Sequence, residues 1–519
     1  MSYTTDEEAV LNYFFTNLDK PVFLARNFHP EVWALMQARY SRSSKGMRES
    51  FLELLHEDEE NFQQLSTFIK GSKAGAQMDH AINKAITFMD KWVLGYGHAS
   101  VAEGAIVGIG IEGVSILATK IIEDNRLASY IEKSTRYVSF GRDSFLIPAA
   151  LKESSYGGEV ERYIDELFQS YKDFHDPVLA YVKKVVPLQE GMNEKAWERS
   201  CGARRFDAIR YLLPTCTKTS LGWTLNARQL AHAISKMLSY PLEEAREIGE
   251  MIRAEGKKVL PSLLKYAEKN EYFSGTEQKM RITAEIYQQP RSTDAVVLVE
   301  ASSDADNRLI ASILYRYSSI PYDDLKEHVK QLTVSEKREI LDEYTKKRGT
   351  FDSLLREFEH VTVTFDVLMD YGAFRDIQRH RICTMTHQLL DSSNGYDIPD
   401  DILKASLDVR STYVKLMEKG EILHKKLSAI DPYAAQYILP LAYKKRTLIT
   451  MNLREAFHFI KIRSTPQGHI SYRSIAKQMF DLLRERHPLI TACFICEMKD
   501  DELGRLAQET KYEERAGKL

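Results

Sequence analysis

The chain has 519 residues, of which 44% are hydrophobic and 28% are charged, and its formal net charge is −3. This length exceeds what one core usually supports, so we expect two domains. The charge balance excludes general binding of polyanions but allows a local basic pocket. No apolar run is long enough to cross a bilayer, the first residues carry no signal-peptide pattern, and five cysteines make no disulfide framework. We therefore expect a cytoplasmic protein.

In chain order, the sequence contains four blocks that occur twice. The first is residues 37–41, which are echoed at residues 314–318. The second is a glutamate followed by apolar residues at alternate positions. Its members are Glu103 with Val107, Ile109 and Ile111, and Glu359 with Val361, Val363, Phe365 and Val367. A period of two predicts a strand with one buried face in each copy.

The third block differs between the copies in a complementary way. The second copy carries the basic triplet Arg379-His380-Arg381, and the first copy reads Asp124-Asn125-Arg126 at that place. The first copy then continues to Ser134-Thr135-Arg136-Tyr137, whereas the second reads Leu389-Leu390-Asp391-Ser392 at the same distance. Neither copy alone has a full set of groups for an anionic ligand, but the two copies together have one.

The fourth block joins a Leu-Pro pair to a Thr-x-Asn-x-Arg segment. The distances from Pro214 to Asn226 and from Pro440 to Asn452 are both twelve residues (226 − 214 and 452 − 440). We expect these asparagines, each with an arginine two positions later (Arg228 and Arg454), at a strand end or a helix start.

Two more arginines near the fourth block are present in only one copy each. Arg210 lies sixteen residues before Asn226 (226 − 210), and Gln436 holds the matching place in the second copy. Arg463 lies eleven residues after Asn452 (463 − 452), and Met237 holds the matching place in the first copy. The losses are again complementary.

The rest of the sequence predicts mainly helices. Apolar residues follow helical spacing after Pro241, Thr333 with Glu336 is typical of a capping box, and residues 400–430 favour a long helix. We place the first copy at residues 1–270, a polar junction at 271–294, the second copy at 295–500 and an exposed charged tail at 501–519.

The triplet at Arg379 offers two permanent cations and an imidazole. Arginine forks match phosphate oxygens, and a cation near a flavin ring would stabilise its reduced, anionic form. The segment at Ser134 offers a hydroxyl, a cation and a phenol, which suit a phosphate and a sugar or base edge, and Glu132 can accept a hydrogen bond from a ribose or a ring N–H. The alternatives are a solvated basic cluster and an exposed turn.

Two further motifs carry weaker signals. His98 and Ser100 precede Glu103 in a Gly-His-Ala-Ser run, where glycine allows a close backbone approach, although a lone histidine is more often structural. Cys493 and Cys496 have CxxC spacing in an apolar run without a second Cys/His pair, so buried free thiols are favoured over a redox or metal role. We predict no metal site.

Taken together, these motifs resemble the flavin-dependent thymidylate synthase family. That family's signature joins Arg-His-Arg, seven residues, Ser, one residue and Arg-Tyr. Here its first half stands at Arg379 and its second half at Ser134. The family's upstream Gly-His-x-Ser/Thr-x-x-Glu-His motif resembles Gly97 to Glu103, with Gly104 in place of the second histidine, and its end is kept at Glu359-His360. The resemblance covers nearly the whole chain as two tandem copies.

The resemblance implies an α+β fold of two tandem domains, each a small, mostly antiparallel sheet with long helices. Family members are homotetramers with active sites between subunits. Carried over, one composite site would bind deoxyuridine monophosphate (dUMP) through Glu132, Ser134, Thr135, Arg136, Arg210, Arg379 and Arg463. The implied FAD contacts are Arg379, His380, Arg381, Ile382, His98, Ser100, Asn226, Arg228, Asn452, Arg454 and His458. The reciprocal site would combine Asp124, Asn125 and Met237 with Leu389, Asp391 and Gln436 and would be silent, so we expect a homodimer that forms a pseudo-tetramer.

The resemblance also implies a reaction. The chain would methylate dUMP to dTMP with methylenetetrahydrofolate as carbon donor and with FAD, reduced by NADPH, as hydride source. Arginines would orient the phosphate and polarise the uracil carbonyl, and Ser134 would bind rather than attack. The sequence departs from the family at Asp376, where glutamine is usual, at His232 and His458, where asparagine is usual, and at Ile131. Two alternatives stay open: a flavoenzyme for another pyrimidine nucleotide, or a non-catalytic nucleotide- or flavin-binding homologue.

Overall fold

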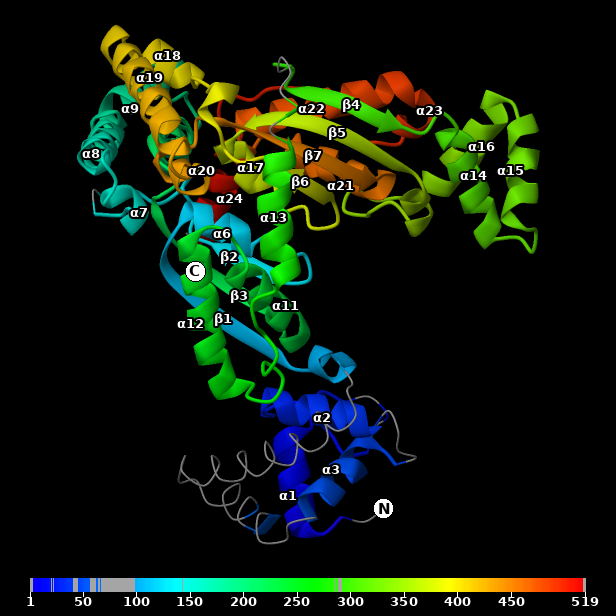
Figure 1. Cartoon of the computed structure of the whole chain (residues 1–519). Helices are drawn as coiled ribbons and strands as arrows, with labels where there is room; N and C mark the ends of the chain where they lie inside the picture. The colour runs from blue at the N-terminus through cyan, green and yellow to red at the C-terminus, as the bar shows by residue number, and fades with distance from the viewer. Residues whose placement is uncertain are drawn as a thin grey trace. The chain divides into compact units, whose positions relative to one another are not determined.

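The computed structural model describes residues 3–19, 21, 23–40, 45–56, 62–63, 66, 99–141, 143–284, 286–287 and 292–516. The chain forms two compact units, both drawn in Figure 1. Unit 1 comprises Met1–Glu112, Leu127–Glu132 and Ser220–Tyr287, and unit 2 comprises Gly113–Arg126, Lys133–Thr219 and Gln288–Leu519. In the part of the chain that the structure describes, no helix is both long and apolar enough to cross a membrane.

Unit 1 begins with three short helices around an aromatic cluster. They are α1 (Thr5–Phe14), α2 (Pro30–Tyr40) and α3 (Met47–His56). A capping box starts α1, because the Thr4 hydroxyl accepts from the Glu7 N–H while the Glu7 carboxylate accepts from the Thr4 N–H. Phe14 and Phe15 are buried against Phe51, with ring centroids 5.0 and 5.8 Å from it.

A three-stranded sheet of order β1-β3-β2 follows, and its strands are β1 (Ile106–Ser115), β2 (Ser129–Glu132) and β3 (Lys218–Asn226). β2 pairs antiparallel with β3 from Ser129↔Thr224 to Glu132↔Leu221. The predicted alternation in β1 is confirmed, because Ile111 is buried between exposed neighbours. The other elements here are η1 (Ala99–Glu103), α11 (Ala227–Leu238), α12 (Glu243–Val259) and α13 (Glu271–Ala284).

Unit 2 is built around a four-stranded antiparallel sheet of order β4-β5-β7-β6. Its strands are β4 (Val296–Ala301), β5 (Thr362–Asp370), β6 (Thr384–His387) and β7 (Lys444–Asn452). The predicted apolar positions of β5 are buried, as at Val363, Phe365 and Val367. Helix α22 (Ile470–Arg486) packs against β4 and β5, and α21 (Leu453–Arg463) packs against β7. The sheet and these helices form the core that carries the candidate site.

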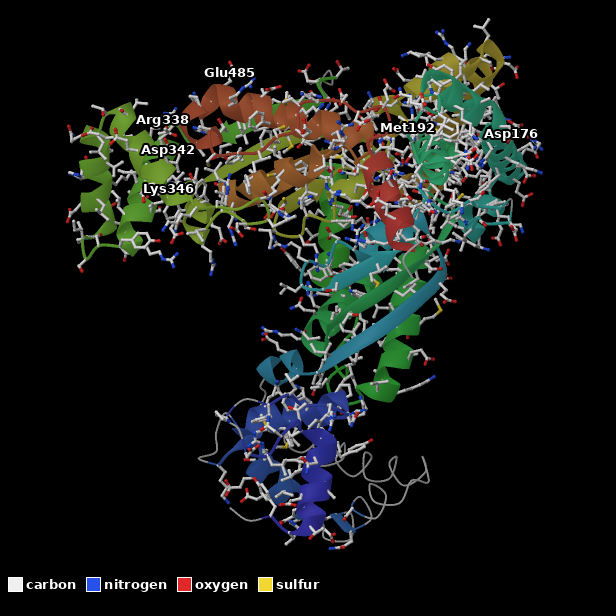
Figure 2. All side chains as sticks on the ribbon, turned by 180° about the vertical axis from the view of Figure 1, so that it is seen from behind. Asp176, Met192, Arg338, Asp342, Lys346 and Glu485 are labelled. Atoms are coloured by element: carbon white, nitrogen blue, oxygen red, sulfur yellow. The ribbon has the colours of Figure 1, made fainter. Side chains whose placement is uncertain are left out.

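Helices gather at both ends of this sheet. At one end lie α14 (Ala305–Arg316), α15 (Tyr322–Gln331) and α16 (Val334–Thr345), and Figure 2 labels Arg338 and Asp342 on α16 and Lys346 directly after it. At the other end lie α8 (Gly157–Asp173), α9 (His175–Val185), α18 (Asp400–Ala405) and α19 (Leu407–Ser428). The remaining elements are α6 (Ile116–Ile122), α7 (Ala149–Lys152), α10 (Glu194–Ile209), η2 (Arg210–Leu212), η3 (Arg356–His360), α17 (Tyr371–Ile377), η4 (Ser392–Asn394), α20 (Pro432–Ala435), η5 (Gln436–Ile438), α23 (Pro488–Thr491) and α24 (Leu506–Ala516).

The two sheets share an order of strands. The order β1-β3-β2 corresponds in sequence to β5-β7-β6, with β4 as an additional edge strand. β3 and β7 each end at an asparagine that caps the next helix. The Asn226 Oδ1 atom accepts from the Gln229 N–H and the Asn452 Oδ1 atom accepts from the Glu455 N–H, both at 2.9 Å. Both positions are therefore a strand end and a helix start.

Within unit 2, the two Leu-Pro segments meet in a reciprocal pattern. The Thr215 N–H donates to the Leu439 carbonyl at 3.0 Å, and the Leu441 N–H donates to the Leu213 carbonyl at 2.9 Å. Pro214 and Pro440 form an antiparallel bridge between these bonds. Because equivalent residues exchange the same bond in both directions, the two segments are related by a local two-fold arrangement.

Two predictions about helices need correction. The helix expected at residues 400–430 is divided into α18 and α19, because Ser406 has an extended backbone and caps α19 by accepting from the Val409 N–H. The tail expected to be exposed instead forms α24, which packs against α10, and Arg505 before it is buried. The capping box at Thr333 and the helix after Pro241 are confirmed.

The two compact units follow other boundaries than the two predicted copies, because residues 133–219 of the first copy belong to unit 2. The two copies are defined by repeated motifs in the sequence, whereas the two units are defined by how the chain packs. The division of the chain into two copies therefore stays a prediction.

Candidate functional site

The loop after β2 carries Arg136, and Ser134 sets its turn. The Ser134 Oγ atom accepts from the Arg136 N–H at 3.1 Å. The Arg136 guanidinium forms a two-point ion pair with Asp207, with Nε–Oδ1 at 2.7 Å and Nη2–Oδ2 at 2.9 Å. Burial opposes the guanidinium charge, but the Asp207 carboxylate outweighs this effect and raises the pKa of Arg136 above its ordinary value. Arg136 is therefore a fixed cation.

Tyr472 on α22 connects Arg136 with Arg463. Its Oη atom accepts from Arg136 Nη1 at 3.2 Å, and the Arg463 guanidinium lies 5.2 Å from the centre of its ring. Arg463 is the last residue of α21, and its Nη2 donates to the Asp376 carbonyl at 2.6 Å. The structure thus brings together an arginine from each of the two predicted copies.

Thr135 makes a second link of this kind. The Arg375 Nη1 atom donates to the Thr135 Oγ1 atom at 3.2 Å, and both side chains are buried. Arg375 lies on α17, one turn before the basic triplet, so this bond joins the loop after β2 to the helix that precedes Arg379.

Arg210 and Asp376 form the centre of the cluster. Arg210 Nη1 lies 3.7 Å from Asp376 Oδ2. Burial would raise the pKa of Asp376, but Arg210, followed by Arg136 and Arg463, outweighs that effect and holds the pKa below its usual value. Arg210 is only 2% exposed, and its Nε and Nη2 atoms have no hydrogen-bond partner among the described residues. Buried charged donors without partners are costly, and an anionic ligand would relieve this cost.

His380 is buried in a chain of hydrogen bonds. Its Nδ1 atom lies 2.8 Å from Glu455 Oε1, and Arg463 Nε donates to its Nε2 atom at 2.8 Å. Because Nε2 accepts, the ring proton lies on Nδ1. Burial and the nearby Arg463 hold the pKa of His380 well below its ordinary value, so the ring is neutral at neutral pH. His380 therefore orients Arg463.

The other members of the triplet region are more open. Arg379 is exposed, Arg381 is half-buried and Ile382 is 65% exposed. His458 on α21 is exposed, and its ring centroid lies 5.7 Å from that of His380. Two cations, an imidazole and an apolar side chain therefore border the surface beside the buried cluster.

The asparagine and arginine pairs have internal partners. In unit 1, Arg228 forms an ion pair with Glu103. In unit 2, Arg454 forms the equivalent pair with Glu359 at 2.8 Å and also donates to the Leu354 carbonyl. Each predicted copy thus contains an Arg–Glu pair that joins the same two motifs within that copy. Both arginines therefore have a structural role.

Three other predicted site residues, Glu132, Ser100 and His98, fall within the sequence bounds of unit 1. Glu132 is the last residue of β2 and is half-buried. Ser100 lies in η1, and His98 lies outside the described residues.

The residues of the predicted silent site have other partners. Gln436 is buried, and its amide is satisfied because Oε1 accepts from the Leu390 N–H at 2.9 Å and Nε2 donates to the Tyr433 carbonyl at 3.1 Å. Asp124 Oδ1 lies 3.8 Å from His387 Nε2. In unit 1, Met237 is buried in the core. Gln436 thus has a structural role, with its amide hydrogen-bonded inside the protein, at the place where the first copy has Arg210.

Comparison of the two copies missed several members of the cluster. Asp207, Tyr472 and Arg505 lie outside the repeated blocks, so no motif marks them. Asp376 stands out in the sequence as a departure from the resembled family, and Arg375 only as a neighbour of the triplet. A search for the counter-charges that buried arginines require would have favoured acidic residues near Arg210, such as Asp207.

The described residues include no group of three or more His, Cys, Asp or Glu side chains that could hold a metal ion. Cys493 and Cys496 are free and half-buried, and burial raises the pKa of Cys493 to about 11.

Comparisons with known proteins place this architecture in a family. The family model described as "Thymidylate synthase complementing protein" matches residues 27–262 and 297–489. A UPF0159 protein of Chlamydia muridarum is 31% identical over 98% of this chain and 98% of its own length. A flavin-dependent thymidylate synthase of Clostridium tetani is 26% identical over 36% of this chain and 72% of its own. A crystal structure of the flavin-dependent thymidylate synthase from Helicobacter pylori, complexed with FAD and dUMP, matches 39% of this chain and 100% of that chain at 18% identity and a TM-score of 0.30. The chain therefore belongs to the thymidylate synthase complementing protein family.

Proposed function

We propose that this chain is a flavin-dependent thymidylate synthase that methylates dUMP to dTMP. Methylenetetrahydrofolate would donate the carbon, and FAD reduced by NADPH would supply the hydride. Membership of the family supports the proposal, as does the partial similarity to relatives named as such synthases. The cluster of arginines around Asp376 also supports the proposal, because arginine side chains form charge-assisted hydrogen bonds with the oxygens of a nucleotide phosphate.

One observation carries the proposal furthest. Arg210 is buried with two donor atoms that lack partners among the described residues, whereas both polar side-chain atoms of Gln436, at the equivalent place, are hydrogen-bonded. An anionic ligand would complete the hydrogen bonds of a buried cation of this kind. A nucleotide phosphate is an anion of the right kind for the two open donors.

In the proposed site, each cation has a separate task. Arg210 and Arg136 would bind the phosphate, and Arg379, which is exposed, would also contact the ligand. Arg463, oriented by His380, would direct charge towards the uracil carbonyl. Ser134 would bind rather than attack, because its Oγ atom already shapes the turn at Arg136. Thr135 would anchor that turn through Arg375.

The residues beside the cluster fit a flavin dinucleotide. Arg379 and Arg381 offer two cations for a pyrophosphate, the exposed Ile382 offers an apolar surface for a ring, and His458 borders the same place. When bound, FAD would supply the hydride chemistry. Asn452 and Arg454 would support this surface from within, through the helix cap and the pair with Glu359. We assign Asn226 and Arg228 the equivalent role in unit 1. His98 and Ser100 would be FAD contacts, as the family resemblance implies.

We further propose that only one of two equivalent sites per chain works. The reciprocal site would present Asp124 and Asp391 to a phosphate, and like charge opposes binding. A homodimer would then be a pseudo-tetramer with two live and two silent sites.

Purified protein loaded with FAD tests the proposal. It should convert dUMP to dTMP with methylenetetrahydrofolate and NADPH. Arg136→Ala and Arg379→Ala should each weaken dUMP binding at least about a hundredfold. The matched controls Asp124→Ala and Asp391→Ala, at the reciprocal site, should change it by no more than about twofold. Equal losses in all four variants would contradict the assignment of live and silent sites, and absence of turnover in the wild type would contradict the activity.

A second candidate is a related flavoenzyme for another pyrimidine nucleotide. Asp376 favours it, because a carboxylate lies where a glutamine is usual in the resembled family, in the middle of the arginine cluster. Comparing dUMP, UMP and dCMP as substrates distinguishes the two, since preference for either of the last two would replace dUMP in the proposal. A non-catalytic binding protein would bind FAD or nucleotide without turnover.

A further inference from the structure

The segment from residue 499 to residue 516, here called the C-terminal strap, lies beyond the residues that the family model matches. It is anchored by ion pairs at several points within unit 2. Arg473 on α22 donates to the Lys499 carbonyl and to Asp500, both at 2.9 Å. On α10, Arg204 donates to Glu502, and Arg199 pairs with Glu509 at 3.0 Å. Helix α24, drawn in red in Figure 1, completes the strap.

Gly504 fixes the position of the strap next to the arginine cluster. A Cβ atom at Gly504 would lie 2.0 Å from the backbone oxygen of Pro466, so only glycine allows this approach. The next residue, Arg505, is buried. The close backbone contact therefore delivers the Arg505 side chain to a defined place.

Arg505 and Arg136 share both of their main partners. Arg505 Nη2 donates to Asp207 Oδ2 at 2.6 Å, the same oxygen to which Arg136 Nη2 donates at 2.9 Å. Arg505 Nε and Arg136 Nη2 both donate to the Gln467 carbonyl at 3.3 Å. Asp207 alone would neutralise Arg136. With a second cation on the same carboxylate, the pair of arginines keeps a net positive charge that an anion can use.

We propose that Arg505 is a positioning residue for the phosphate of the nucleotide. Through Asp207 and the Gln467 carbonyl it holds the Arg136 guanidinium in place and balances the charge of Asp207, so that Arg136 can serve a phosphate. This inference rests on the proposed function of the same site. It assigns a positioning role to a segment of the chain outside the matched family region.

The test measures the affinity of the FAD-loaded protein for dUMP and for deoxyuridine, which lacks the phosphate. Arg505→Ala should weaken dUMP binding about tenfold or more and leave deoxyuridine binding unchanged. Arg505→Lys, which keeps the charge, should restore part of the dUMP affinity. Lys511→Ala, which removes an exposed charge from the same strap, is the control and should behave as the wild type. Unchanged dUMP affinity in Arg505→Ala, or an equal loss for both ligands, would overturn the proposal.

A second measurement separates this inference from the proposed function. Phenylglyoxal modifies accessible arginines, and the rate at Arg136 can be followed by mass spectrometry of its peptide. Without Arg505, Arg136 should react faster than in the wild type and in Lys511→Ala. If the wild type binds no dUMP, the proposed function fails, and the phenylglyoxal rates decide the positioning role alone. An unchanged rate at Arg136 then overturns it.

Discussion

Asp370 shows how burial sets the chemistry of a single residue beside the site. Its Oδ1 atom caps α17 by accepting from the Ala373 N–H at 2.7 Å, and Ser471 donates to its other oxygen. The side chain is fully buried, and burial, together with the charge of Asp397, raises the pKa of Asp370 to about 6. The folded protein therefore binds a proton at this residue more tightly than the unfolded chain does.

This shift predicts a defined pH dependence of stability. Between pH 4 and pH 6 the unfolded chain releases the Asp370 proton while the folded protein keeps it, so the contribution of Asp370 to stability falls as pH rises. Asn cannot titrate and still caps α17. The free energy of unfolding of Asp370→Asn should therefore increase relative to the wild type across this range, by at most about 3 kcal/mol. Urea unfolding at a series of pH values measures the difference. A difference that stays constant with pH would refute the assigned pKa.

At the residue scale, the sequence predicted which arginines matter better than it predicted their partners. Arg136, Arg210 and Arg463 were found because each is present in one copy and replaced in the other. Asp207 and Tyr472 were not, because they belong to no motif and meet Arg136 only after folding. Ion pairs between residues distant in sequence leave no periodic signal.

At the scale of elements, local sequence patterns predicted the strands well but did not predict where a helix is broken. Alternating apolar residues located β1 and β5, because one face of each strand is buried. The interruption at Ser406 was missed, since the helical pattern continues on both sides and one serine cap decides the break. The many charges of residues 501–519 predict an exposed tail, whereas charges of the strap pair with α10 and α22.

The contact between α8 and α19 offers a test at this scale. A Cβ atom at Gly420 on α19 would lie 2.2 Å from the Tyr163 hydroxyl on α8. Both residues are buried. Gly420→Ala should therefore destabilise the protein by about 1–3 kcal/mol through overpacking. The control Gly158→Ala lies on an exposed part of α8 with no atom nearer than 3.5 Å, and it should stabilise by about 0.5–1 kcal/mol. Thermal unfolding compares the two. Equal effects would show that α8 and α19 do not pack as described.

At the scale of the whole molecule, reciprocal contacts are the strongest structural sign of a duplicated architecture. The exchanged bonds at Pro214 and Pro440 join equivalent segments of the two predicted copies, and each predicted copy contains its own Arg–Glu pair at the matching place. Arg210 and Gln436 differ from this pattern. Two donor atoms of Arg210 have no partner among the described residues, whereas Gln436 is hydrogen-bonded within the protein.

The most direct test of this account is the number of dUMP molecules that one chain binds. FAD-loaded protein is titrated with dUMP while the visible flavin spectrum and the heat of binding are followed. We predict that both signals saturate at one nucleotide per chain. Saturation at two nucleotides per chain would contradict the silent reciprocal site, and absence of binding would contradict the composite site itself.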